Sequence, residues 1–155
     1  NANLPHPTHH VTLTFNKAPV RAFMNQFNKS LTMNSPEMLE QYSEALKRFG
    51  RALNRALFNN AAHRHNKSIL MIPVFEGLQS DKTPHVHVSI QVPREKLIAF
   101  QDKADAAWKA ASPFAGRTHT EIIFDSYGAN YYNSKQSVFT DRQSIDFDSV
   151  LLPKS

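Results

Sequence analysis

The sequence predicts an α+β fold: a central, mainly antiparallel sheet of about five strands with its helices on one face. Three observations predict it. Short segments rich in β-branched residues alternate polar with apolar side chains, two longer segments repeat apolar residues every three or four positions, and polar turn residues separate them. The 155 residues, 41% hydrophobic and 20% charged, suit one globular domain rather than a disordered chain. We therefore expect a single domain spanning residues 1–155.

The first strand and the first long helix have the clearest signals. Residues 9–15 alternate as a half-buried strand does. Ser35, Pro36 and Glu37 supply an N-cap, a proline in the first turn and an early acid, so a helix should follow. Gly50 lowers helix preference and indicates a bend or a close contact. The apolar stripe of this helix consists of Leu39, Tyr42, Leu46, Phe49, Leu53 and Leu57.

The later elements complete the topology. Residues 68–76 and 85–92 read as a hairpin, because a polar connection with turn residues separates them. A second helix is predicted over 93–111, a strand over 118–124, a short helix over 127–136 and a final strand over 145–152. The order βαββαβ, followed by αβ, is related to ferredoxin-like folds.

Composition limits the function classes. Without cysteine there is no disulfide, Cys-ligated zinc or thiol nucleophile. No apolar run approaches the ~20 residues that cross a bilayer, so we expect no membrane association. The first residue is not Met, so we expect a fragment of a longer protein.

The charge is clustered, which fits a polyanionic partner and equally fits a solvated helix face followed by a basic loop. The net charge is +5, and no acidic residue lies between Glu44 and Glu76. Clustered Lys and Arg are typical of proteins that contact phosphates. The candidates for DNA contacts are Arg48, Arg51, Arg55, Arg64 and Lys67, with Lys47 beside them.

Two histidines on one strand form a candidate metal site. His85 and His87 share a face of their strand, because side chains at i and i+2 do so; His63 and His65, at a helix end or loop, do not converge in this way. Glu76 ends the partner strand of the hairpin and becomes a cross-strand neighbour. Two imidazoles and a carboxylate suit a divalent cation. The alternative is that these are ordinary polar residues on a solvated strand and turn. The third ligand could also be His9, His10 or Asp125 instead of Glu76. A role as a helix N-cap explains Asp125 equally well.

The predicted helix over 127–136 carries a candidate nucleophile. Tyr132 and Lys135 share one face of it, and Tyr127 and Tyr131 share another. A phenol has a pKa near 10, so as a nucleophile it needs positive charge, a metal or a base nearby. Lys135 would supply such charge. The alternative is that the tyrosines pack into the core and Lys135 is solvated.

Taken in order, these segments resemble the three motifs of the HUH endonuclease superfamily, in particular the Rep-like nicking domains of rolling-circle replication initiators. In that family the motifs are a Thr-Leu-Thr-like strand, a His-hydrophobic-His strand with an upstream acid, and a helix with Tyr-x-x-Lys. The matching segments are Val11-Thr12-Leu13-Thr14-Phe15, then Glu76 with Pro84-His85-Val86-His87-Val88, then Tyr132-Asn133-Ser134-Lys135.

The resemblance implies a site-specific endonuclease and ligase of single-stranded DNA. His85, His87 and Glu76 would bind Mg2+ or Mn2+, Tyr132 would attack the phosphodiester to form a 5′-phosphotyrosine and a free 3′-OH, and Lys135 would stabilise the charge. Tyr131, or less favourably Tyr127, is the alternative nucleophile. Asn130 stands where the related Tyr-x-x-Lys-Tyr pattern would place lysine after Tyr127, which favours Tyr132.

The resemblance also implies partners and a setting. The DNA would be a replication origin or the end of a mobile element, in single-stranded or hairpin form, and a helicase domain or host replication proteins would assist. The compartment would be the cytoplasm of a bacterium, or the nucleus for a eukaryotic element or virus. Two alternatives from other classes are a non-catalytic single-strand-binding module of RNA-recognition-like fold and a metal-dependent phosphoesterase that activates water.

Overall fold

The computed structural model describes residues 6–59, 67–78, 82–123 and 144–153, and these form an α+β fold. Four long antiparallel strands and one two-residue strand make a sheet in the order β4-β1-β3-β2-β5. The strands are β1 (His9–Phe15), β2 (Leu70–Glu76), β3 (His85–Gln91), β4 (Ala115–Ile122) and β5 (Ser144–Ile145). The helices are α1 (Lys17–Met24), α2 (Pro36–Phe58) and α4 (Phe100–Ala111), with short 3-10 turns η1 (Arg94–Lys96) and η2 (Phe147–Ser149).

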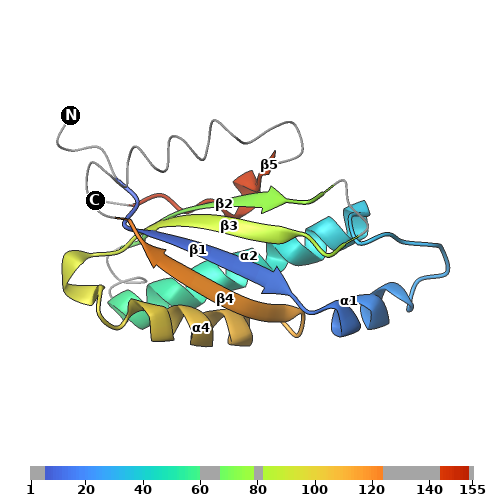
Figure 1. The fold of residues 1–155 in the computed structure, drawn as a ribbon, viewed down its shortest axis with the longest axis horizontal. Helices are drawn as coiled ribbons and strands as arrows, with labels where there is room; N and C mark the ends of the chain where they lie inside the picture. The colour runs from blue at the N-terminus through green and yellow to red at the C-terminus, as the bar shows by residue number, and fades with distance from the viewer. Residues whose placement is uncertain (1–5, 60–66, 79–81, 124–143, 154–155) are drawn as a thin grey trace.

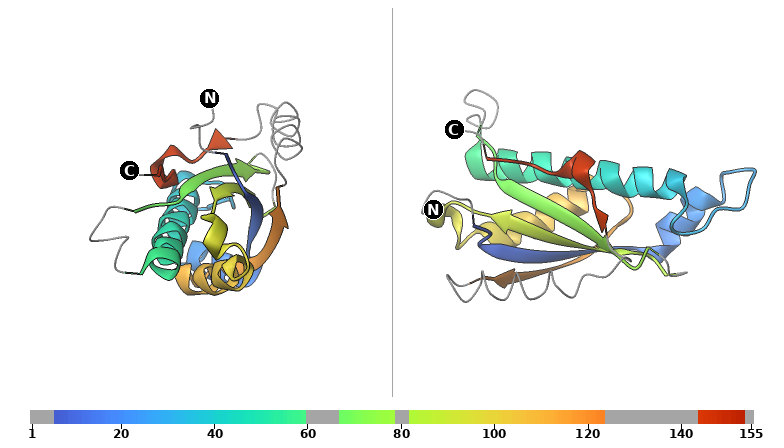
Figure 2. Two further views of the ribbon diagram at one scale, coloured as in Figure 1. Left: turned by 90° about the vertical axis from the view of Figure 1, so that its left-hand side faces the viewer. Right: turned by 90° about the horizontal axis from the view of Figure 1, so that it is seen from above.

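The helices α2 and α4 cover one face of the sheet, as the views in Figures 1 and 2 show. Successive side chains of a strand point to opposite faces of the sheet, so every second residue faces the two helices. On β1 these are Val11, Leu13 and Phe15, which are buried in the core with residues of both helices. Trp108 of α4 meets Phe49 of α2 edge to face, and its indole nitrogen donates a hydrogen bond to Thr14 O at 3.0 Å. This contact joins the helix layer to β1.

Most of the predicted elements are confirmed, with corrections at their bounds; β2 begins at Leu70 rather than at 68, and β3 ends at Gln91 rather than at 92. The α+β class and the antiparallel sheet are present, and the predicted strand at 9–15 has the bounds of β1. The helix predicted over 93–111 begins only at Phe100, because residues 94–96 form the tighter η1 turn. The strand predicted over 118–124 begins earlier, at Ala115. The helix predicted over 127–136 lies outside the described residues.

The final strand is largely wrong as predicted. Only residues 144–145 pair with β2, and the chain then turns through η2. The turn is held by Asp146, whose carboxylate accepts hydrogen bonds from the hydroxyls of Ser43 and Ser149 at 2.8 and 2.6 Å. A single bridge from Leu151 to Met71 follows. A polar interaction with α2 therefore overrides the strand preference of this segment.

No sequence pattern predicted α1. It is one short helix of eight residues with Pro19 near its start. Proline is accepted in the first turn, where the backbone N–H has no partner within the helix. Val20 is its buried residue and joins the core, so tertiary packing rather than a strong local signal holds it in place.

Gly50 makes the close contact that its position in α2 indicated. A Cβ built at this residue would lie 2.8 Å from Leu151 Cδ1 and 3.2 Å from Met71 Cε. The missing side chain therefore lets the C-terminal segment and β2 approach the helix.

Enlarging residue 50 should destabilise the fold through this contact. We expect Gly50→Leu to lower the free energy of unfolding by about 1–3 kcal/mol, because overpacking forces neighbours to move. Gly50→Ala should cost less, since the clash is with the end of a flexible side chain and alanine favours the helix. Urea unfolding tests both. Adding Leu151→Ala should restore part of the loss in Gly50→Leu; strictly additive effects would contradict the contact.

His9 is a buried histidine on the helix-facing side of β1. It is 2% exposed, and its ring lies 4.5 Å from the Phe100 ring, measured between centroids. Burial lowers the pKa of His9 from 6.5 to about 4, because removal from water disfavours the charged form. The ring therefore stays neutral in the folded protein at pH values where it is protonated in the unfolded chain.

This difference should make the stability depend on pH. Between pH 6.5 and about 4 the unfolded chain binds a proton that the folded protein does not, so stability falls as the pH falls. On acidification the wild type should lose up to about 3 kcal/mol more than His9→Leu, measured by urea unfolding at several pH values. His119→Gln, at an exposed position, should follow the wild type. Parallel curves for the wild type and His9→Leu would contradict the assignment.

Candidate active site

The sheet face opposite the helices carries the candidate site. Because Val86 and Val88 face the core, His85 and His87 lie on the other face of β3. The strand register brings Glu76 of β2 directly opposite His85, and Thr12 of β1 directly opposite His87. Three adjacent strands therefore converge there, beside the hairpin connection between β2 and β3.

His87 is the centre of the contacts on this face. Its Nε2 contacts the Glu76 carboxylate, and its Nδ1 lies 3.3 Å from the Thr12 hydroxyl. The His10 ring stacks on it, with centroids 5.3 Å apart and planes 20° apart. Three neighbouring side chains thus fix the position of this imidazole, whose side chain is 18% exposed.

The donor chemistry fits a divalent cation, and one pair of the predicted ligands is in contact. His87 and Glu76 supply an imidazole nitrogen and a carboxylate oxygen, which suit Mg2+ or Mn2+ together with water. Within the described ranges, no three His, Asp or Glu side chains are grouped closely enough to hold an ion as they stand. His85 is exposed and lies directly opposite Glu76 in the strand register.

The alternative ligands differ in their position relative to His87. His9 points to the core on the other side of the sheet and is therefore excluded from a site with His87. His10 lies on the same face as His87, but it is only 6% exposed. Asp125 lies outside the described residues.

The neighbours that β4 contributes to this face were not predicted from the sequence. His119 is directly opposite Thr12, and its Nε2 lies 3.2 Å from Glu121 Oε1. Arg117 is exposed two residues before His119 and so shares its face of the strand. The alternation Arg-Thr-His-Thr-Glu over 117–121 was the available signal, because it places three charged or ionisable groups on one face.

The basic residues predicted to contact DNA do not gather at this site. Arg48, Arg51 and Arg55 are exposed on α2 and lie opposite its buried stripe, so they point away from the sheet. Lys67 is exposed just before β2, at the end of that strand far from Glu76. Arg64 lies outside the described residues. A DNA strand on the histidine face would have to wrap around an edge of the sheet to reach α2.

The candidate nucleophiles fall outside the described part of the chain. This applies to Tyr127, Tyr131 and Tyr132, and to Lys135. The remaining tyrosine is Tyr42 on the helix side, whose hydroxyl donates a hydrogen bond to Met33 O at 2.8 Å. Burial raises the pKa of Tyr42 to about 12, which makes this phenol harder to ionise and unsuitable as a nucleophile.

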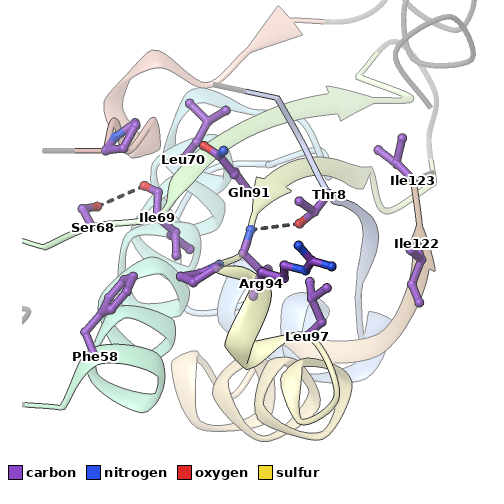
Figure 3. A pocket seen from close by; sticks show the side chains of 13 residues that line it. Thr8, Phe58, Ser68, Ile69, Leu70, Gln91, Arg94, Leu97, Ile122 and Ile123 are labelled. Carbon is purple, nitrogen blue, oxygen red and sulfur yellow. Dashed lines mark hydrogen bonds between the residues drawn. The ribbon is translucent and has the colours of Figure 1, made fainter. Parts of the chain in front are cut away.

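A groove of about 820 Å³ lies at the opposite end of the sheet. It begins at Gln91, six residues along β3 from His85, which corresponds to about 20 Å of strand. Figure 3 shows Arg94 extending between Thr8 and Leu97 at this groove. Its described lining residues include no histidine, tyrosine or carboxylate, so the groove does not have the donors of the histidine site.

Comparison with protein-family models, curated proteins and solved structures finds no match to this chain. The local geometry and the sequence motifs are therefore the basis for assigning a function. No helix in the described ranges is long and apolar enough to span a membrane.

Proposed function

We propose that the protein is a metal-dependent endonuclease and strand-joining enzyme of single-stranded DNA, of the HUH type. The observation that carries the proposal is the contact between His87 and Glu76 beside His85, on one face of two paired strands. These are the same three side chains that the sequence motifs indicate as metal ligands. They lie at the end of β2 and the start of β3, where Glu76 and His85 are exposed and accessible to a large substrate.

Each residue has a stated role in the proposed reaction. His87, Glu76 and His85 would hold Mg2+ or Mn2+, which would supply charge stabilisation at the scissile phosphate. The Tyr132 oxygen would form a bond to phosphorus while the bond from phosphorus to the 3′ oxygen breaks. The phenol proton would end on that oxygen, giving a 5′-phosphotyrosine and a free 3′-OH. Lys135 would stabilise the negative charge of the phenolate.

A single strand is the proposed substrate form because it can bend to present a phosphate in line with the nucleophile. Arg117 and His119, exposed on the same face as His87, are candidate phosphate contacts. The DNA would be an origin or element end, single-stranded or in a hairpin. A helicase domain or host replication proteins would act with it, in the bacterial cytoplasm or, for a eukaryotic element or virus, in the nucleus.

Trapping the covalent intermediate tests the nucleophile. With an element-end oligonucleotide and Mn2+, the wild type should give an adduct that survives a denaturing gel, because the phosphotyrosine bond is covalent. Tyr132→Phe should abolish the adduct while retaining DNA binding, and Tyr131→Phe should retain it. Cleavage without an adduct would indicate attack by water instead. Binding without cleavage, with or without Mn2+, would indicate a non-catalytic module.

Removing a proposed ligand should weaken metal binding without unfolding the protein. We expect His87→Ala and Glu76→Gln each to weaken Mn2+ binding at least tenfold by isothermal titration, since each removes one of few donors. His119→Ala, on the same face but outside the proposed ligand set, is the matched control and should bind like the wild type. Equal affinities for all four proteins would show that the cation binds elsewhere.

A further inference from the structure

Thr12 occupies the middle of the histidine face. The register places it directly opposite His87 on one side and directly opposite His119 on the other. Of these two neighbours, it is His87 that its hydroxyl reaches, at 3.3 Å from Nδ1. The two nitrogens of His87 therefore have different partners, because Nε2 contacts Glu76.

This arrangement determines which nitrogen of His87 faces the carboxylate. An imidazole that binds a cation through Nε2 carries its proton on Nδ1. In metal sites, a hydrogen-bond partner at that second nitrogen orients the ring of the histidine ligand. A hydroxyl can accept a hydrogen bond from a protonated Nδ1 and can donate one to an unprotonated Nδ1. Thr12 can therefore pair with His87 whether Nε2 donates to Glu76 or binds an ion.

His10 cannot replace Thr12 in this role. Its ring stacks on the face of the His87 ring, with 20° between the planes, and so limits tilting. Stacking allows a 180° flip of the imidazole about its Cβ–Cγ bond, which exchanges Nδ1 with Cδ2 and Nε2 with Cε1. The Thr12 hydroxyl meets the edge of the ring and favours the orientation in which Nδ1 faces it.

We propose that Thr12 is the positioning residue of the site: it holds His87 with Nε2 toward Glu76 and pairs with Nδ1 when a cation binds. The inference rests on the proposed function for the identity of the ligand, and on the described geometry for the orientation of the ring. It gives the Thr-Leu-Thr strand a role at the site that does not require contact with DNA.

Two substitutions separate the hydroxyl from the shape of the side chain. Thr12→Val removes the hydroxyl and keeps a β-branched residue on the strand, whereas Thr12→Ser keeps the hydroxyl. Thr120→Val is the matched control, because it makes the same change on adjacent β4 at a hydroxyl that is buried and has no hydrogen-bond partner among the described residues. All variants should remain folded, as circular dichroism would confirm.

The measurements are Mn2+ affinity by isothermal titration and the 15N shifts of the His87 ring by NMR, first without metal and then with diamagnetic Mg2+. We expect Thr12→Val to weaken Mn2+ binding by about 10-fold or more and to alter the Nδ1 and Nε2 shifts already in the metal-free protein. Thr12→Ser and Thr120→Val should match the wild type in both measurements.

The outcomes distinguish this inference from the proposed function. Unchanged His87 shifts or unchanged Mn2+ affinity in Thr12→Val would overturn the positioning role, even in an active nuclease. A wild type that binds no Mn2+ would overturn the proposed function; altered His87 shifts in metal-free Thr12→Val would then still support the orientation of the ring by Thr12.

Discussion

The pairing register of β1, β3 and β2 is the constraint on which the site depends. Side chains alternate between the two faces of a strand, so a shift of one residue would exchange them. It would turn His85 and His87 into the core and expose Val86 and Val88. The buried valines make that shift costly, because each would lose the apolar environment under the helices. The hydrophobic core thus fixes the position of the polar site.

The two faces of the sheet carry different side chains. On the inner face, Trp108 and Phe49 belong to a core that the helices cover. The outer face presents imidazoles, carboxylates and a threonine hydroxyl. The two adjacent histidines of β1 show the division most clearly: His9 is held neutral in the core beside Phe100, whereas His10 stacks on His87. Residue type alone does not decide the role of a histidine; the face of the strand does.

Local patterns were enough to predict the elements that place the proposed metal ligands. The alternation at 9–15 and the hairpin predicted from 68–76 and 85–92 are confirmed, and they bring Glu76 opposite His85. The patterns failed where long-range contacts compete with local preference. Asp146 binds Ser43 of α2 and turns the C-terminal segment away from the predicted strand. The charge cluster on α2 was visible in the sequence, but its direction relative to the histidines depends on helix packing.

The order of the amino acids was sufficient to predict the α+β class and the strand that carries His85 and His87, because the period of apolar residues and turn preferences are local properties. It left a bend or a close contact open at Gly50. The folded chain decided that Glu76 contacts His87 rather than its direct neighbour His85, that Thr12 reaches Nδ1, and that Arg48 and its neighbours lie away from the histidine face. These facts depend on strand order and on the side of the sheet to which the helices pack. Both arise from contacts between residues far apart in the chain, which no local pattern contains.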